Sequence, residues 1–283
     1  MLLTPDFIFL NNPRTGTTFA RKAIKAAYAS TSPSTGEEGM RFGASAVEEL
    51  LLPIRRGLGR KGRDHHGTYS QIPETHRELP VVSAVRNPFT LLVSVYELRL
   101  WASAPLPHGV TQAHYPTFPN LTFDEFLQLQ QLEMSQRWAL PINSRGVGPL
   151  SVHFLQMFAR RPAAAIGDVR RAAPERLIDA HVPEIVFLRQ ERLREELCGL
   201  LRSVRPGIRV AEVEALEATH VTKRSQVWCH SCFDMATVTQ ILEREAFLFG
   251  ALARRGIVYT LENADFVQGG GPRKEAADRG AAG

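Results

Sequence analysis

Residues 11–18 read N-N-P-R-T-G-T-T and directly follow the apolar run F-I-F-L. A strand, a turn with a glycine and then a helix is the layout of a phosphate-binding loop, because a helix N-terminus presents N–H groups and a partial positive charge to an anion. Here Gly16 permits a close backbone approach, Thr17 and Thr18 offer hydroxyl and N–H groups, and Arg14 supplies a full positive charge. The alternative is an ordinary strand-to-helix turn capped by threonines, and this stretch alone leaves both interpretations open.

The loop lacks the lysine that ends the common nucleotide-binding sequence G-x-x-x-x-G-K-[ST], which argues against a triphosphate held with Mg²⁺. A second segment, R-N-P-F-T-L-L-V-S-V-Y at residues 86–96, follows the apolar run V-V-S-A-V. It places Ser94 about two helical turns after Arg86. An arginine fork and a hydroxyl donor together suit a phosphate monoester. The competing interpretation is an arginine that caps carbonyl groups at the end of a strand.

The pair His65-His66 lies between these segments, in H-H-G-T-Y-S-Q-I-P. Histidine is a natural general base because its pKa lies near the working pH. Either ring is a candidate, and the alternative is a pair of solvent-facing histidines. The basic stretch before the pair is interpreted as a solvated loop rather than a docking site for an anionic acceptor. Its basic residues are Arg55, Arg56, Arg60, Lys61 and Arg63.

The stretch W-C-H-S-C at residues 228–232 has a C-x-x-C spacing, from Cys229 to Cys232. A redox C-x-x-C follows a strand at the start of a helix, whereas no strand is predicted here, and a zinc site would need a second pair of ligands. No H-x-x-x-H or carboxylate cluster has the spacing of metal ligands. We therefore expect no metal, and a thiol redox protein is the last of the functional hypotheses.

Hydrophobic patterning predicts the elements that position these segments. Short apolar runs at residues 7–10, 81–85 and 185–188 are typical of buried parallel strands, and helical periodicity follows each of them. This alternation predicts an α/β fold with a P-loop-like, mainly parallel central sheet flanked by helices. In such folds ligands bind beyond the carboxyl ends of the strands, where residues 13–18 and 86–88 both lie. The predicted helices cover residues 17–29, 89–101, 122–138, 150–160, 189–203 and 233–255.

Length and composition predict one domain. The chain has 283 residues, of which 44% are apolar, enough for a single α/β unit over residues 1–268 with loop excursions at 31–64 and 102–121. Residues 269–283 are rich in glycine and charge, which predicts a disordered tail.

The net charge of +5 indicates anionic ligands in general. It does not indicate nucleic acid, because the basic residues are not gathered into one stripe. No apolar run approaches the roughly 18 residues of a membrane span, and residues 1–10 lack the basic start of a signal peptide. With only three cysteines, these features predict a soluble cytoplasmic protein. The excess of arginine over lysine favours a bacterial source with a GC-rich genome.

The segments P-R-T-G-T-T and V-R-N-P-F-T-L-L-V-S-V-Y resemble, in this order, the two signature segments of the sulfotransferases that use 3′-phosphoadenosine 5′-phosphosulfate (PAPS). H-H-G-T-Y-S-Q-I-P is similar to the histidine-bearing segment of the carbohydrate and bacterial branches of that family. The resemblance implies that the first loop grips the 5′-phosphosulfate, that Arg86 and Ser94 hold the 3′-phosphate, and that His66 rather than His65 is the catalytic base. The loop residues so implied are Arg14, Thr15, Gly16, Thr17 and Thr18.

Two departures from the family pattern change what is expected. Arg14 stands where the family usually carries a lysine, and because arginine stays charged its role would be electrostatic rather than that of a proton donor. Leu91 stands where the family often has an arginine. The segment T-H-V-T-K-R-S at residues 219–225 resembles a polar loop that closes over the nucleotide, with a solvated approach to a helix as an equal alternative. The residues concerned are Lys223, Arg224 and Ser225.

The resemblance implies transfer of the sulfuryl group of PAPS, the cosubstrate, to a hydroxyl of a small-molecule, carbohydrate or lipid acceptor by in-line displacement, with an amine as second choice. The alternatives are a P-loop small-molecule kinase or nucleotide hydrolase, and a non-catalytic nucleotide-binding module of the same fold. The sequence leaves the acceptor and the oligomeric state open. The Pro-rich stretch 105–119 is interpreted as a lid that contacts the acceptor through His108, His114 and Tyr115.

Overall fold

The computed structural model describes most of the predicted α/β unit. The predicted site residues Lys223, Arg224 and Ser225 lie outside the described residues, as do His108 and the pair Cys229 and Cys232. The same holds for the predicted tail and for large parts of the two loop excursions. The described residues are 1–29, 47–53, 62–99, 101, 114–138, 146–168, 174–217 and 233–264.

Three parallel strands form one side of a five-stranded sheet with the order β3-β1-β2-β6-β7, in which β7 is an edge strand. They are β2 (Ile8–Leu10), β6 (Val81–Val85) and β7 (Val186–Arg189). Ile8 lies opposite Val81 in the register of β2 and β6. All residues of β2 and β6 are buried, as expected for strands that are covered on both faces.

The remaining strands are short. β1 (Leu2–Leu3) pairs antiparallel with β2 on one side and with β3 (Glu48–Glu49) on the other. A separate two-stranded sheet joins β4 (Leu52–Pro53) to β5 (Arg63–Asp64), directly before the two histidines.

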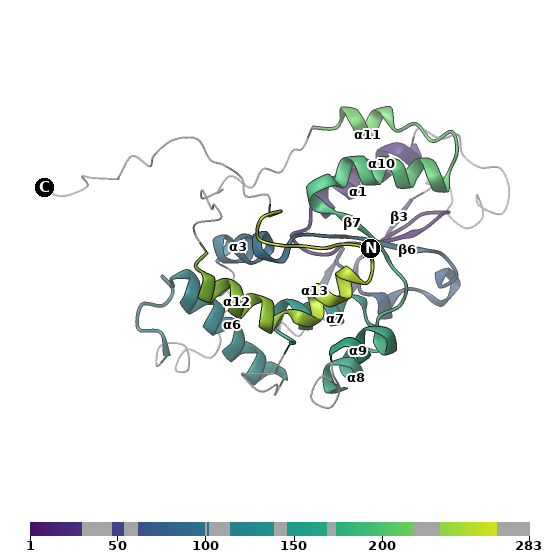
Figure 1. Cartoon of the computed structure of the whole chain (residues 1–283). Coiled ribbons are helices and arrows are strands. Elements are labelled where there is room, and N and C mark those ends of the chain that lie inside the picture. Colours follow the sequence, from purple (N-terminus) through teal and green to yellow (C-terminus); the bar gives the residue numbers. More distant parts are fainter. Residues whose placement is uncertain are drawn as a thin grey trace, which may run out of the picture.

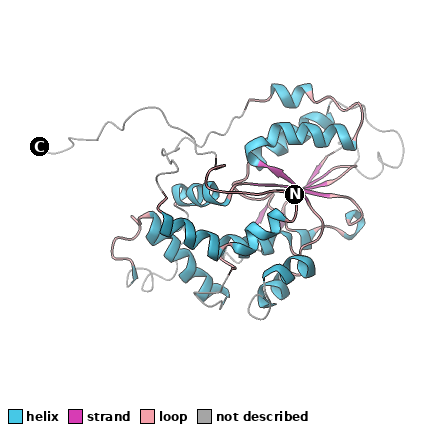
Figure 2. Cartoon of the chain, viewed as in Figure 1, coloured by secondary structure: helices cyan, strands magenta, loops and turns pink. Residues whose placement is uncertain are grey.

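Helices lie on both faces of the five-stranded sheet (Figures 1 and 2). On one face lie α1 (Thr17–Ala29), α10 (Leu193–Val204) and α11 (Ala211–Ala215). A larger layer packs on the other face. It contains α3 (Pro88–Leu98), α6 (Phe123–Trp138), α7 (Pro149–Phe158), α8 (Pro162–Asp168), α9 (Pro174–His181), α12 (Met235–Arg244) and α13 (Ala246–Ala253).

Two hydrophobic cores follow from the alternation of side chains along the strands. Phe7 and Phe9 pack into the core under α1 and α10, whereas Ile8 and Leu10 pack into the larger core on the opposite face. The run F-I-F-L is apolar throughout because both of its faces are covered.

The structure also contains short 3₁₀ helices between the main elements: η1 (Tyr69–Gln71), η2 (Glu74–His76) and η3 (Gln190–Arg192).

The three predicted strands and the mixed α/β class are confirmed. A capping box begins α6, because Thr122 N donates to Glu125 Oε2 at 2.7 Å and Glu125 N donates to Thr122 Oγ1 at 3.3 Å. The single helix predicted over 233–255 is wrong. The chain forms α12 and α13 instead, and they meet at Glu245, whose backbone leaves the helical conformation (φ −103°, ψ 20°).

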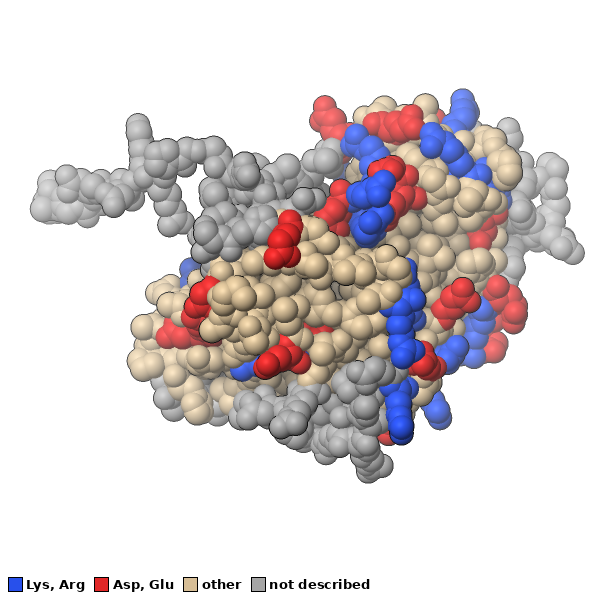
Figure 3. All heavy atoms as spheres, viewed as in Figure 1, with Lys and Arg blue, Asp and Glu red and all other residues tan. Residues whose placement is uncertain are grey.

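Acidic and basic side chains are interspersed over α10 and α11, whereas the surface over α12 and α6 carries few charges (Figure 3). None of the described helices combines the length and the apolar character that a membrane crossing requires.

Candidate functional site

The carboxyl ends of the three parallel strands meet at one edge of the sheet. There β2 leads into residues 11–18, β6 leads into Arg86, and β7 leads into η3. This is the edge at which open α/β sheets bind ligands. We call this region the strand-end site. It comprises residues 11–18, residues 86–94 and the histidines His65 and His66.

Asn12 organises the first loop. Its carbonyl oxygen accepts hydrogen bonds from Thr15 Oγ1 at 2.9 Å and from Thr17 Oγ1 at 3.2 Å. Its amide Nδ2 donates to the carbonyl of Ala84 on β6 at 3.1 Å, which ties the loop to the neighbouring strand. The hydroxyls of Thr15 and Thr17 are therefore engaged inside the loop, while Thr18 is exposed. The N–H groups of the first turn of α1 are the donors that a helix start leaves for a ligand.

The backbone of the loop takes up a left-handed conformation twice. Gly16 has φ +78°, and a Cβ at this position would lie 2.7 Å from Leu193 Cδ2, so only glycine fits. Arg14 has φ +67°, which a residue with a side chain adopts at a cost of about 1 kcal/mol. Such strain persists where the surroundings impose it, and here it directs the Arg14 side chain toward α3.

Arg14 and Arg86 come together across the two loops. Arg14 Nη2 donates to the carbonyl of Ser94 at 2.7 Å, and Arg86 donates through Nε to Thr90 Oγ1 at 2.9 Å and through Nη1 to the carbonyl of Arg14 at 3.4 Å. Burial lowers the pKa of both guanidinium groups. Within the described part of the chain neither forms a salt bridge, and the buried Nε of Arg14 has no hydrogen-bond partner. The predicted proximity of Arg14, Arg86 and Ser94 is thus present.

Glu191 holds the second loop in place. Its Oε1 accepts from the backbone N–H of Asn87 at 2.8 Å, and its Oε2 accepts from the hydroxyl of Tyr259 at 2.9 Å. Burial and this carboxylate raise the pKa of Tyr259, so the phenol stays a donor. The side-chain Nδ2 of Asn87 donates to the carbonyl of Thr260 at 2.9 Å and to Asn263 Oδ1 at 3.0 Å. Residues far along the chain therefore support the loop that carries Arg86.

The side chain of His66 contacts the first residue of the first loop. Its Nδ1 lies 2.7 Å from the carbonyl oxygen of Asn11. Because a carbonyl only accepts, Nδ1 must carry the proton, and the Nε2 of the neutral ring is then the basic nitrogen. The His65 ring lies against that of His66 with 4.1 Å between centroids and the ring planes tilted by 42°. Burial lowers the pKa of His65. Asn11 Nδ2 donates to the carbonyl of His65 at 2.7 Å, which attaches this pair to the loop.

A further histidine reaches the loop without any local signal in the sequence. His153 lies in the buried helix α7, and its Nε2 is 3.3 Å from Asn12 Oδ1. The Asn12 amide nitrogen faces the carbonyl of Ala84, so Oδ1 is the acceptor and His153 Nε2 is the donor. Within an apolar helical pattern this residue is indistinguishable from a core histidine, and its contact with the loop depends on the tertiary fold.

Other predicted features lie away from the strand-end site. Tyr115, a predicted lid residue, is buried in the larger core, and His114 lies against it with 6.3 Å between ring centroids. Trp101 stacks on Tyr96 with 5.5 Å between ring centroids in the same core. Among the described residues no group of three or more potential ligands could hold a metal ion.

Comparisons with family models, with curated proteins and with solved structures find no match for this chain.

Proposed function

We propose that the strand-end site binds PAPS and transfers its sulfuryl group to an acceptor hydroxyl. The observation that carries the proposal is the pair Arg14 and Arg86, which is partly removed from water without a salt bridge among the described residues. Two like charges in such a place are unfavourable, and the nearby carboxylates of Glu97 and Glu191 offset the cost of burying them only in part. A bound anion would stabilise the pair further. The resemblance of both loops to those of PAPS-dependent sulfotransferases suggests which anion this is.

The two loops divide the nucleotide between them in this proposal. Arg14 and the N–H groups at the start of α1 hold the 5′-phosphosulfate, because guanidinium and helix N-terminus both favour anionic oxygens. Arg86 holds the 3′-phosphate from the neighbouring strand end, with the Ser94 hydroxyl as a second donor. Asn12 attaches the first loop to β6, and Glu191 attaches the second loop to the residues that follow β7.

The proposed reaction is an in-line displacement at sulfur. The Nε2 of His66 accepts the proton of the acceptor hydroxyl while the hydroxyl oxygen forms the new bond to sulfur. The bond between sulfur and the bridging oxygen breaks, and adenosine 3′,5′-bisphosphate leaves with the electron pair. Arg14 stabilises the charge that develops on the leaving phosphate and remains protonated throughout. The sulfate ester and the bisphosphate are the products.

Thermal unfolding in the presence of nucleotides tests the binding part of the proposal. Adenosine 3′,5′-bisphosphate should raise the Tm clearly more than AMP at the same concentration, because only the bisphosphate reaches Arg86. Equal protection by the two nucleotides would refute the assignment of a 3′-phosphate to Arg86 and Ser94.

Sulfate transfer from ³⁵S-labelled PAPS to extracts of the producing organism tests the catalytic part. His66→Gln should lose transfer while bisphosphate binding persists, and Arg14→Ala should weaken both. His65→Gln serves as the matched control, because in this proposal His65 does not touch the acceptor. Binding of the bisphosphate without any transfer would favour the non-catalytic module, and Mg²⁺-dependent turnover of ATP would favour a kinase or hydrolase.

A further inference from the structure

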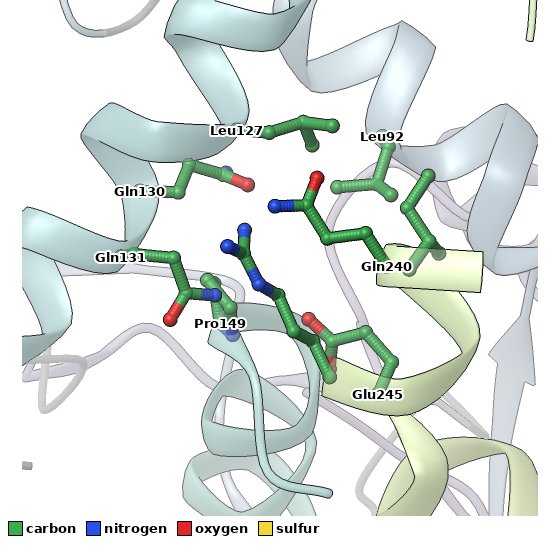
Figure 4. A pocket seen from close by; sticks show the side chains of 9 residues that line it. Leu92, Leu127, Gln130, Gln131, Pro149, Gln240 and Glu245 are labelled. Atoms are coloured by element: carbon green, nitrogen blue, oxygen red, sulfur yellow. The ribbon is translucent and has the colours of Figure 1, made fainter. Parts of the chain in front are cut away.

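A small hollow lies between α3, α6 and α12, apart from the strand-end site. About 260 Å³ of space between the side chains lies in it, a figure that includes space open to solvent. Leu92 on α3 lines it, whereas Ser94 points to the other side of that helix, because positions two apart on a helix face nearly opposite directions. Gln130 and Gln240 point into the hollow from α6 and α12 (Figure 4). Leu127, Gln131 and Arg244 contribute further to its wall.

Arg244 carries a positive charge into this hollow. Burial lowers the pKa of its guanidinium group, so part of its hydration is lost. Among the described residues no carboxylate forms a salt bridge with it. With the Gln240 amide oriented so that its oxygen faces the guanidinium, this oxygen accepts from Nη2 at 2.5 Å and from Nη1 at 3.0 Å. A neutral amide oxygen satisfies hydrogen bonds but brings no charge, and the nearby Glu245 offsets the lost hydration of the guanidinium only in part.

The neighbouring carboxyl group is committed elsewhere. Glu245 turns into the protein and accepts from Leu150 N at 3.1 Å, Ser151 N at 2.8 Å and Ser151 Oγ at 2.7 Å. These donors belong to the N-terminus of α7, which Glu245 therefore caps. Gly148 makes room for this arrangement, because a Cβ there would lie 2.3 Å from Glu245 Oε1. Glu245, the one carboxyl group among the described residues that line the hollow, is thus hydrogen-bonded to α7 rather than to Arg244.

We propose that this hollow binds the carboxylate group of a small organic acid. The guanidinium group is a planar fork that matches the two oxygens of a carboxylate, and Gln130 and Gln131 add amide N–H donors beside it. Gln131 is almost fully buried, yet its amide reaches the hollow. Leu92, Leu127 and Pro149 line the rest with apolar surface, which suits the carbon chain of an organic acid better than a hydrated inorganic anion. The remainder of the ligand extends toward solvent.

This proposal does not depend on the proposed sulfotransferase activity. Leu92 is the one residue of the range 86–94 that also lines the hollow. The two sites use different arginines. Each proposal therefore stands or fails by itself, provided that the two ligands are titrated separately.

Titration with succinate, followed by the ¹H–¹⁵N signals of the arginine side chains, tests the site. The Nε signal of Arg244, assigned by its loss in Arg244→Gln, should shift and saturate with a Kd on the order of 1 mM. Succinamide, which has the same shape without charge, should leave this signal in place. Arg254 is the internal control, because this exposed arginine already pairs with Asp179.

The variants separate charge from geometry. By thermal shift, Arg244→Gln should reduce the response to succinate at least about tenfold, and Arg244→Lys should be intermediate because it keeps the charge but not the fork. Arg86→Gln should leave the succinate response unchanged. The proposal is overturned if the Arg244 signal does not saturate, if succinamide shifts it equally, or if sulfate binds there more tightly than succinate.

Discussion

The strand-end site and the hollow between α3, α6 and α12 both contain arginines that form no salt bridge with another described residue. The two sites differ in the groups that accept hydrogen bonds from these arginines. Arg14 and Arg86 donate to backbone carbonyls and to a threonine at the ends of buried strands. Arg244 is held by the side-chain amide of Gln240, which can rotate. Donors that are fixed before the ligand arrives lose less conformational freedom on binding. The strand-end site should therefore bind its anion more tightly than the hollow does.

The largest expected effect comes from removing the more buried of the two strand-end arginines. Arg86→Gln should lower the affinity for adenosine 3′,5′-bisphosphate about 100-fold, because a buried charge-assisted fork to phosphate is lost. Isothermal titration calorimetry measures this change. Arg244→Gln is the matched control and should leave bisphosphate affinity unchanged. If both variants weaken bisphosphate binding equally, the distinction between the two sites is wrong.

The cap that keeps Glu245 away from Arg244 should contribute strongly to stability. Glu245→Gln replaces one accepting oxygen by an NH₂ group that faces the donors at the start of α7, so the free energy of unfolding should fall by about 2 kcal/mol. Urea denaturation measures the loss.

Glu243→Gln on the exposed side of α12 is the control and should change stability by less than about 0.5 kcal/mol. Equal stability of the two variants would mean that Glu245 does not cap α7.

Gly16→Ala tests whether the strand-end loop depends on its backbone conformation. The positive φ and the close approach of Leu193 should make this change cost about 1–2 kcal/mol of unfolding free energy and weaken bisphosphate binding. Gly199→Ala in α10 is the opposite case, since a Cβ there meets no atom within 4 Å. It should stabilise the protein by about 0.5–1 kcal/mol through helix propensity. If Gly16→Ala and Gly199→Ala change the free energy of unfolding in the same direction, this account of the two glycines is wrong.

The smallest expected effect concerns the pH dependence of stability. We expect it at the strand-end site, because no histidine is among the described residues that line the hollow. Burial lowers the pKa of His65 in the folded protein, so the unfolded chain binds the proton more readily. The contribution of His65 to stability is therefore complete above the unfolded pKa of about 6.5 and is lost as the pH falls below it. His65→Gln should flatten this part of the stability profile, measured by urea denaturation at several pH values. An unchanged slope would show that His65 titrates normally.

The sequence predicted those parts of the molecule whose signal is local. The run at residues 7–10 is apolar at every position because Phe9 and Ile8 enter different cores, and this pattern identified a central strand. The loop at residues 11–18 and the segment after β6 were placed at the same edge because parallel strands end together. The contact between these two segments, in which Arg14 donates to the carbonyl of Ser94, follows from that topology.

What the sequence did not predict depends on contacts between distant segments. His153 looks like any histidine in an apolar helix, and only the packing of α7 brings it to Asn12. The long helical pattern that includes Glu245 does not reveal that this side chain turns inward to cap another helix. The hydroxyl of Thr17 was expected to face a ligand, but the turn geometry directs it, like the hydroxyl of Thr15, to the carbonyl of Asn12.

Asn87 is hydrogen-bonded to partners 173 and 176 positions later in the chain, at Thr260 and Asn263. During synthesis on the ribosome the loop after β6 therefore emerges long before the segment that supports it. A nascent chain that stops before residue 257 contains both arginines of the strand-end site but lacks Tyr259 and the other braces of the second loop. Competence to bind the nucleotide should accordingly arise late, as one of the last events of folding, and not when the first loop leaves the exit tunnel.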